Sequence, residues 1–156
     1  MTGEPESPQI AAGAIACPGD GDDVIMYASW SKFSRDENQQ YDGLQPQAVR
    51  QDSDGISITW VEFFQPPPPS IHQACQAIVK GGTTIRKSGV FAIARAGKIR
   101  AIAREMGLSI QIERDPVPGN DGHALIKGWS TELVDLLASV FERSISPEAV
   151  PGLLGC

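Results

Sequence analysis

The second half of this chain, residues 89–143, restricts the possible folds more than any other part of it. Short hydrophobic runs predict strands, and longer runs with hydrophobic residues three and four positions apart predict helices. In chain order the pattern predicts a buried strand at 90–94, a helix at 95–106, strands at 110–113 and 124–129, and a helix that begins after Ser130. A loop rich in proline and glycine joins the two later strands, so we expect them to form an antiparallel pair.

The first half of the chain adds two strands and one helix. Hydrophobic residues alternate with small or polar ones over 24–33 and again over 56–60, and the turn signal Ser-Asp-Gly at 53–55 precedes the second run. The four prolines at 66–69 cannot continue that strand. They therefore connect it to a helix, which ends before Gly81.

Two of the predicted helices carry start signals and a hydrophobic side. Ser70 and Gln73 match the Ser-x-x-Gln capping box, and Ser130 is placed to cap the last helix. Hydrophobic residues then recur at helical spacing. They are Ile71, Ala74, Cys75, Ile78 and Val79 in the first helix, and Leu133, Leu136, Leu137, Val140 and Phe141 in the last.

Helices with one hydrophobic side need a sheet to cover. The elements therefore predict an α/β (α+β) fold, a mixed sheet of about five strands with about three helices. A chain of 156 residues corresponds to one domain. We expect that domain to span 24–146, after a flexible leader at 1–23 without hydrophobic periodicity, and before a short tail at 147–156.

Composition limits the environment and the partners. The chain has 13 basic and 19 acidic residues, and its net charge of −6 argues against a nucleic-acid coat or a membrane-surface protein. Its three cysteines are an odd number and do not suggest a disulfide framework, so a cytoplasmic location is expected. No hydrophobic run approaches the ~20 residues that span a bilayer, so no membrane partner is expected.

The charges are unevenly distributed along the chain. Residues 1–80 hold 11 acidic and 4 basic residues, residues 81–127 hold 4 acidic and 8 basic ones, and residues 128–156 hold 4 acidic and 1 basic. The candidates for binding a phosphate or an acidic partner are therefore Arg86, Lys87, Lys98, Arg100 and Arg104. They do not share one helical face, so a solvated surface is the more common explanation.

Two other short motifs are weighed and set aside. Residues 81–88, Gly-Gly-Thr-Thr-Ile-Arg-Lys-Ser, imitate a phosphate-binding loop, but Arg86 stands where a glycine is required and a helix precedes the segment. His72 and Cys75 are three positions apart and could face one metal ion, but no second ligand pair accompanies them. We therefore expect no metal and no cofactor.

His123 is the residue with the clearest chemical potential. It stands where a loop enters a predicted strand, close to Asp121, whose carboxylate could orient the imidazole for acid–base work. The alternative is a structural histidine that bonds a backbone carbonyl and holds the proline-rich loop. No nucleophile motif accompanies it, which favours the structural role.

The segment from Asp54 to Trp129 resembles a group of small uncharacterised prokaryotic proteins. These carry an Asp-Gly-x-Ser strand, a hydrophobic helix, and a proline-rich loop that leads into His-Ala-Leu-Ile-x-Gly. The matching parts here are Asp-Gly-Ile-Ser at 54–57 and the stretch from Asp115 to Gly128, although Asn-Asp-Gly-His at 120–123 replaces the more usual Asn-Pro-Ala-His. The resemblance implies the fold and no activity.

Taken alone, the sequence favours a non-enzymatic cytoplasmic module that binds a protein partner or itself, as a subunit of a larger prokaryotic complex. One alternative is a small enzyme or ligand-binding domain centred on His123 and Asp121. A second is a nucleic-acid accessory that uses the basic segment 86–104. A cleft that contains His123 would favour the first alternative, and salt-sensitive binding to a duplex would favour the second.

Overall fold

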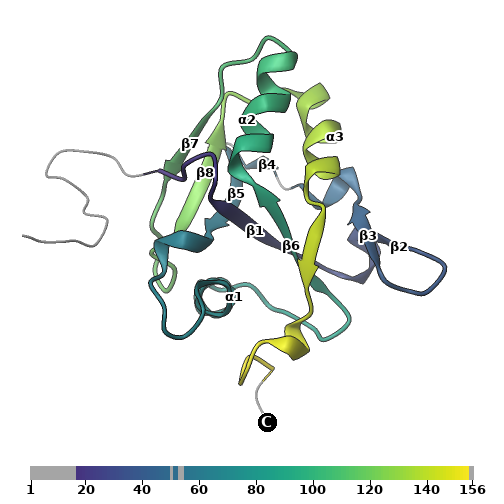
Figure 1. Ribbon diagram of the computed structural model, residues 1–156, viewed down its shortest axis with the longest axis vertical. Coiled ribbons are helices and arrows are strands. Elements are labelled where there is room, and N and C mark those ends of the chain that lie inside the picture. The colour runs from purple at the N-terminus through teal and green to yellow at the C-terminus, as the bar shows by residue number, and fades with distance from the viewer. Residues whose placement is uncertain (1–16, 50, 53–54, 155–156) are drawn as a thin grey trace, which may run out of the picture.

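The computed structural model describes residues 17–49, 51–52 and 55–154 of this chain (Figure 1). It confirms the α/β class, with three α-helices against one large sheet. The helices are α1 (Ser70–Lys80), α2 (Ala96–Glu105) and α3 (Thr131–Val140). Short 3-10 turns lie at η1 (Trp30–Lys32), η2 (Pro46–Ala48), η3 (Val61–Phe63) and η4 (Pro147–Ala149).

The large sheet has seven strands, six of which run in the order β7-β8-β5-β1-β6-β9, with β4 paired to β5. All the pairs among the described strands are antiparallel, so the sheet is larger and more uniform than the sequence suggests. Its strands are β1 (Asp23–Ala28), β4 (Gln51–Asp52), β5 (Gly55–Trp60), β6 (Val90–Arg95), β7 (Gln111–Arg114), β8 (His123–Lys127) and β9 (Arg143–Ile145). The predicted pairing of the two later strands is confirmed, since Ile112 lies opposite Ile126.

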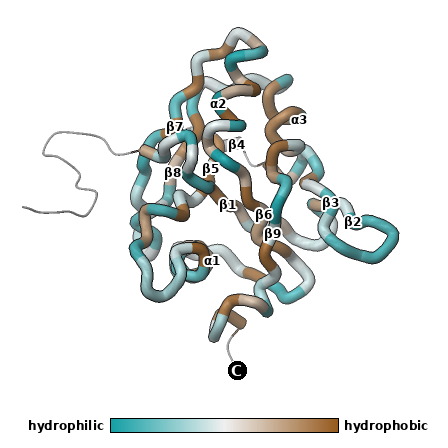
Figure 2. The backbone as a smooth tube through the Cα atoms, viewed as in Figure 1, coloured by the Kyte–Doolittle hydropathy of each residue, from teal (hydrophilic) through white to brown (hydrophobic). Residues whose placement is uncertain are grey.

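Successive side chains of β1 point to opposite faces of the sheet, and two hydrophobic clusters follow from this alternation. Val24 and Met26 join a cluster with the inner sides of α2 and α3, whereas Ile25 joins a second cluster with α1. In Figure 1, α2 and α3 lie side by side and α1, seen end-on, lies across the sheet from them. Figure 2 shows the hydrophobic residues concentrated in the central strands and in α3.

A hairpin at 33–44 and the short strands β4 and β9 have no counterpart in the sequence prediction. The hairpin of β2 (Phe33–Arg35) and β3 (Tyr41–Leu44) projects from the domain, and its connecting loop is hydrophilic (Figures 1 and 2). The short strand β9 extends the sheet beside β6. The turn signal at 53–55 lies mostly outside the described residues.

The predicted capping box of α1 is wrong. Pro69 occupies the N-cap position, and no side chain caps the helix. Instead the Ser70 hydroxyl bonds to the carbonyl of Phe64, and the Gln73 amide donates to the carbonyls of Gln65 and Pro68, each at 2.7 Å. The two side chains hold the proline-rich connector against the helix, because the carbonyls of Phe64, Gln65 and Pro68 lie within hydrogen-bond distance of them. The Ser130 cap is confirmed, since its hydroxyl accepts from the Leu133 N–H at 3.2 Å.

The segments on either side of the predicted domain contact it. In the part of the leader that the structure describes, Asp20 pairs with Arg100 at 2.8 Å, and its carbonyl accepts from the Gly97 N–H at 3.0 Å. In the tail, Pro147 and Val150 are buried. Residues 1–16 lie outside the described part of the chain. Within that part, no helix combines the length and the hydrophobicity that crossing a membrane requires.

Candidate functional site

The sheet opens between β1 and β5. These neighbours pair only at Val24 opposite Trp60 and Ile25 opposite Thr59, while β1 continues along β6 as far as Ala28. At the other end of β5, it is β4 that pairs with Gly55 and Ile56. A cavity of about 850 Å³ lies where the two strands diverge.

The cavity passes between the strands, because residues from both faces of the sheet line it. Met26 and Ile58 belong to the cluster under α2 and α3, whereas Ile25 and Ile78 belong to the cluster under α1. Two loops complete the walls, one after α1 at residues 81–84 and one between β7 and β8 that includes Val117 and Asn120. The cavity thus lies at the gap between the two strands and opens to solvent beside the exposed residues Ser29, Gly82 and Thr84.

Buried polar groups form the end at which the strands meet. Thr59 and Asn120 have only 2% and 3% of their surface exposed. The Asn120 amide donates to the Thr59 hydroxyl at 2.9 Å, and its oxygen accepts from the Gly122 N–H at 3.1 Å. Buried polar side chains need such partners, and this pair fixes the β7–β8 loop to β5.

A glycine allows this loop to approach α1. Gly119 has φ +88°, and a Cβ atom there would lie 2.2 Å from the Lys80 carbonyl oxygen. Only glycine adopts that backbone without strain and leaves room for the helix end. The close contact brings Asn120 beside Gly81 and so forms one wall of the cavity.

His123 lines the same cavity, opposite Thr59 in the β5–β8 register. Its Nδ1 lies 2.9 Å from the carbonyl oxygen of Asp115 and 3.2 Å from the Asp115 carboxylate. A carbonyl can only accept, so the network assigns the proton to Nδ1. The neutral ring then has Nε2 as its acceptor, as for a histidine that a carboxylate orients.

The carboxylate beside His123 comes from Asp115, whereas Asp121 is exposed. The backbone carbonyl of Asp121 accepts from Arg114 Nη2 at 3.0 Å, and the Arg114 guanidinium lies 4.6 Å from the centre of the Phe63 ring. Position 121 is nearer in sequence, but the antiparallel β7–β8 pair brings 115 across to 123. The orienting role predicted for Asp121 is therefore placed by this geometry at Asp115.

The opposite end of the cavity carries a cation. Lys32, on η1, lines the cavity together with Ser29 and Gln47. Its side chain is partly buried and forms no ion pair with another described residue. The described residues that line the cavity include no Asp or Glu.

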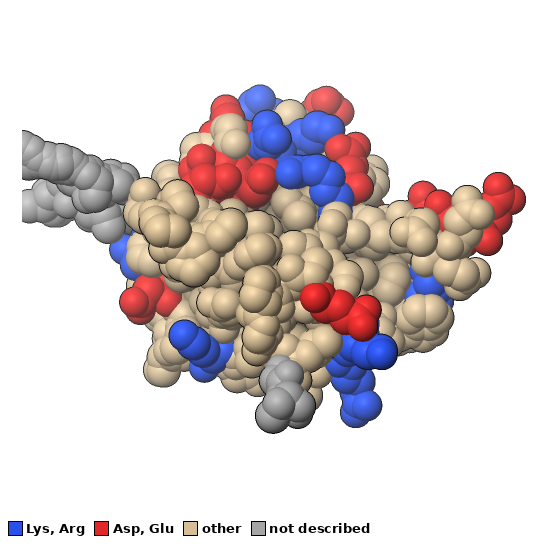
Figure 3. Space-filling view, turned by 60° about the horizontal axis from the view of Figure 1, so that its bottom comes forward, with Lys and Arg blue, Asp and Glu red and all other residues tan. Residues whose placement is uncertain are grey.

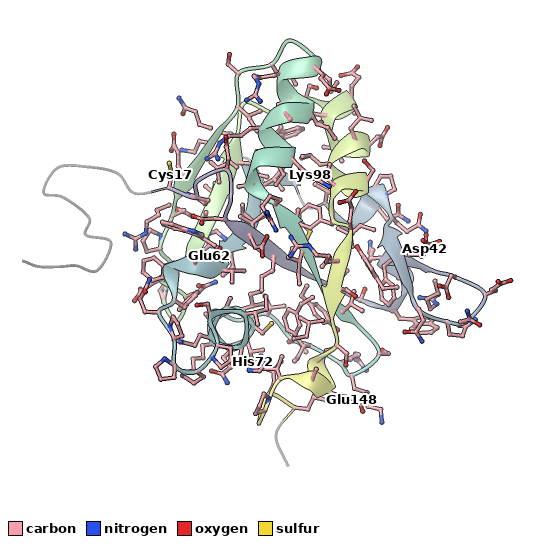
Figure 4. The ribbon with its side chains drawn as sticks, in the orientation of Figure 1. Cys17, Asp42, Glu62, His72, Lys98 and Glu148 are labelled. Carbon is pink, nitrogen blue, oxygen red and sulfur yellow. The ribbon has the colours of Figure 1, made fainter. Side chains whose placement is uncertain are left out.

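The predicted basic candidates are dispersed, and most have acidic neighbours. Lys87 pairs with Glu148 at 3.7 Å, Lys98 with Glu142 at 2.5 Å, and Arg100 with Asp20 at 2.8 Å. Arg86 is exposed and its backbone bonds to the Tyr27 hydroxyl, while Arg104 is exposed on α2. Figure 3 shows basic and acidic side chains next to one another, and Figure 4 shows Lys98 and Glu148 at separate parts of the molecule. Acidic residues from the first and last parts of the chain thus form ion pairs with three of the five basic candidates.

A second charged cluster lies at the start of β1. The Asp23 carboxylate accepts from Arg143 Nη2 at 2.6 Å and from Arg95 Nε at 3.1 Å. Burial opposes ionisation of Asp23, but the hydrogen bonds and charges of Arg143 and Arg95 outweigh it and lower the pKa of this carboxyl. Glu62 accepts from the Asp23 N–H at 2.8 Å, and burial, with the charges of Asp23 and Asp22, raises the pKa of Glu62. A cavity of about 260 Å³ borders this cluster, but its cations already have acidic partners.

The two described cysteines, Cys17 and Cys75, do not form a metal site with His72. Cys75 is fully buried, and burial raises the pKa of its thiol to about 12, so it is an unreactive core residue. Figure 4 shows His72 on α1, far from Cys17 at the start of the described chain. Among the described residues, no group of three or more His, Cys, Asp and Glu side chains could hold a metal ion.

The glycine-threonine segment at 81–84 lines the cavity, although it does not resemble a phosphate site in its placement. It follows the C-terminal end of α1, where the helix dipole is negative, whereas phosphate binds at N-terminal ends.

Comparison with protein-family models, with curated proteins and with solved structures finds no match to this chain.

Proposed function

We propose that this chain is a small-molecule-binding domain whose ligand occupies the cavity between β1 and β5. The observation that carries the proposal is the opening of the sheet itself, which leaves about 850 Å³ at the centre of the fold. Ligand sites are commonly cavities of roughly 300–1,000 Å³ with hydrophobic walls and a few converging polar groups. Here Met26, Ile58 and Ile78 form hydrophobic walls, and Thr59, Asn120 and His123 supply polar groups.

Binding is a better account of these polar groups than catalysis. Thr59 and Asn120 bond to one another, and the His123 ring is fixed through Nδ1. Such fixed donors and acceptors hold a ligand in one orientation without further ordering of side chains. The enzyme hypothesis would need a group that attacks or protonates the ligand, and the titratable side chains on the described cavity lining are those of Tyr27, Lys32 and His123.

Bulky substitutions at the cavity wall test the proposal. Ser29 and Thr84 are exposed residues that line the cavity, so Ser29→Trp and Thr84→Trp should fill its mouth without disturbing the core. Ser139→Trp on the outer side of α3 is the matched control. We expect ligand-observed NMR with a fragment library to detect molecules that bind the wild type and Ser139→Trp and are lost in the two mouth variants.

Backbone NMR shifts should locate the bound fragments at Thr59, Asn120 and His123. Equal binding to all four proteins would place the fragments elsewhere, and an absence of bound fragments would count against a ligand-binding domain. Fragments that bind at millimolar strength are sufficient, because the comparison between variants carries the result.

A protein-interaction module is the second candidate, and one surface feature favours it. The Trp30 side chain is 49% exposed on η1, and the Arg35 guanidinium lies 3.5 Å from the centre of its ring. Tryptophan and arginine are the residues most enriched at the energetic centres of interfaces. Trp30→Ala should then reduce self-association in sedimentation velocity or recovery of a specific partner, with Leu136→Ala on α3 as the exposed control.

The nucleic-acid alternative is the least supported of the three. Its basic residues are dispersed and mostly paired with acids. We expect no salt-sensitive retardation of a generic duplex at physiological ionic strength, because dispersed and paired cations neutralise few phosphates and so release few of the counterions condensed on the duplex.

A further inference from the structure

The cavity has two chemically different ends, and their order along it follows from the chain. β1 and β5 meet at Thr59, and Asn120 and His123 lie at this closed end. Lys32, Ser29 and Gln47 belong to segments that follow β1 and β3, so they lie where the strands have separated. A hydrogen bond of 2.8 Å from the Gln45 N–H to the Lys32 carbonyl holds these two segments together.

The open end is suited to a negative charge. An ammonium without an acidic partner is free to form an ion pair with a carboxylate that enters the cavity. Lys32 is in this position among the described residues, in a chain with a net charge of −6, and the described lining of the cavity has no acid. A carboxylate on the ligand would supply the missing charge.

The closed end is suited to a hydrogen-bond donor and not to an anion. With the proton on Nδ1, His123 presents Nε2 as an acceptor. The C-terminal end of α1, at Gly81, lies against Asn120, and the negative end of a helix dipole disfavours an anion there. A hydroxyl or an amide N–H on the ligand satisfies both features.

Hydrophobic side chains connect the two ends. Met26, Ala28 and Ile58 line the cavity between them and belong to the hydrophobic cluster under α2 and α3. A hydrocarbon body buries apolar surface against these residues.

We infer that the ligand is an amphipathic organic acid, with its carboxylate at Lys32, an aliphatic body against Met26, Ala28 and Ile58, and a terminal hydroxyl or amide donor at His123. This inference rests on the proposed function, since it names the chemistry of the molecule that fills the same cavity. It assigns Lys32 and His123 as the two residues that determine specificity.

Matched probes separate the contributions of the two ends. The probes are hydroxyhexanoate, hydroxyoctanoate and hydroxydecanoate with the hydroxyl at the far carbon, their methyl esters, and the corresponding acids without the hydroxyl. In calorimetry or NMR titration with the full chain, the best hydroxy acid should bind about tenfold more tightly than its ester and several-fold more tightly than the plain acid. The preferred chain length distinguishes a small metabolite from a fatty acid.

Two variants assign each preference to one residue. Lys32→Met should remove the preference for acid over ester and keep the preference for the hydroxyl, and Lys32→Arg should restore the first. His123→Phe should remove the preference for the hydroxyl and keep the preference for the acid. Backbone NMR spectra would show that each variant is folded, and Asp115→Asn provides a milder change at the same end if His123→Phe is not.

The outcomes separate this inference from the proposed function. If fragments bind in the cavity but acids bind no better than esters, or the preference survives Lys32→Met, the assigned chemistry is wrong and the ligand-binding domain stands. If neither fragments nor these probes bind, the proposed function fails and this inference fails with it.

Discussion

The face of the sheet under α2 and α3 and the face under α1 are covered in different ways. Two helices with continuous hydrophobic sides cover the first, and Leu133 and Leu137 are fully buried there. One helix covers part of the second, together with the C-terminal segment around Val150, and the loops at 81–84 and 117–120 border the cavity. Both buried polar side chains found among the described residues, Thr59 and Asn120, lie on this second side.

The difference explains why the cavity forms where it does. Helices bring hydrophobic side chains that close a sheet face by burial, whereas loops bring backbone polar groups that need hydrogen-bond partners. On the α1 side, Asn120 and Gly122 meet β5 through hydrogen bonds, so β1 and β5 are not drawn together by a continuous hydrophobic layer. Stability is therefore expected to depend mainly on the face under α2 and α3, whereas the buried polar groups of the cavity come from the other face.

The largest effect is expected from Leu137→Ala, on the α3 side. Leu137 has no exposed surface, so its truncation should lower the free energy of unfolding by about 2–5 kcal/mol. Leu136→Ala is the matched control, because Leu136 is 43% exposed on the same helix. Urea unfolding of both variants measures the contrast, and similar losses for the two would mean that α3 does not carry the core of this face.

Asn120→Ala should have an intermediate effect, since it removes the polar junction of the other face. The Thr59 hydroxyl and the Gly122 N–H would lose their partner while buried, which costs about 1–3 kcal/mol. Asn38→Ala in the exposed hairpin loop should change stability little. A loss in Asn120→Ala as small as that of the control would show that water replaces the amide and that the junction is open to solvent.

His123→Ala should cost about 1 kcal/mol, because the Asp115 groups that it leaves are only partly buried and can bond to water. Ligand binding should fall much more than stability, which is the reverse of the result for Leu137→Ala. His72→Ala on α1 is the control. A large loss of stability with unchanged binding of the fragments would instead support the purely structural role that the sequence favours for this histidine.

The sequence predicts the first face better than the second, for physical reasons. Periodicity reports burial against a sheet, so the burial of Leu133 and Leu137 and the strand pair at 112 and 126 are correctly predicted. Leu136, predicted on the same hydrophobic side of the helix, is instead 43% exposed. The hairpin β2–β3 and the strand β9 are too short or too polar to produce such a pattern. Ser70 and Gln73 match a local motif, but nearby carbonyls of the connector compete for their side chains and prevail.

The candidate site is predicted only in part, because it depends on contacts between distant residues. The sequence draws attention to His123, which lines the cavity, but the carboxylate beside it is that of Asp115, which the antiparallel register brings to it. Thr59 and Asn120 are 61 positions apart in the chain, and neither stands in a recognisable motif. Lys32 has no periodic or spacing signal, because it is distinguished by its place on the cavity wall and by the lack of an acidic partner among the described residues.

The smallest expected effect, and one that depends on pH, is that of Glu62→Gln. Burial raises the pKa of Glu62, so folding favours its protonated form. Its contribution to stability is then complete below the ordinary pKa of a glutamate and is lost as pH rises through the folded pKa. Glutamine keeps an oxygen that can accept from the Asp23 N–H but never ionises. The stability of Glu62→Gln relative to wild type should therefore increase from acidic to neutral pH and then level off.

Glu37→Gln in the exposed hairpin loop provides the control. Urea unfolding at a series of pH values measures the trend, and a relative stability that falls as pH rises would show that ionised Glu62 stabilises this edge of the α1 face.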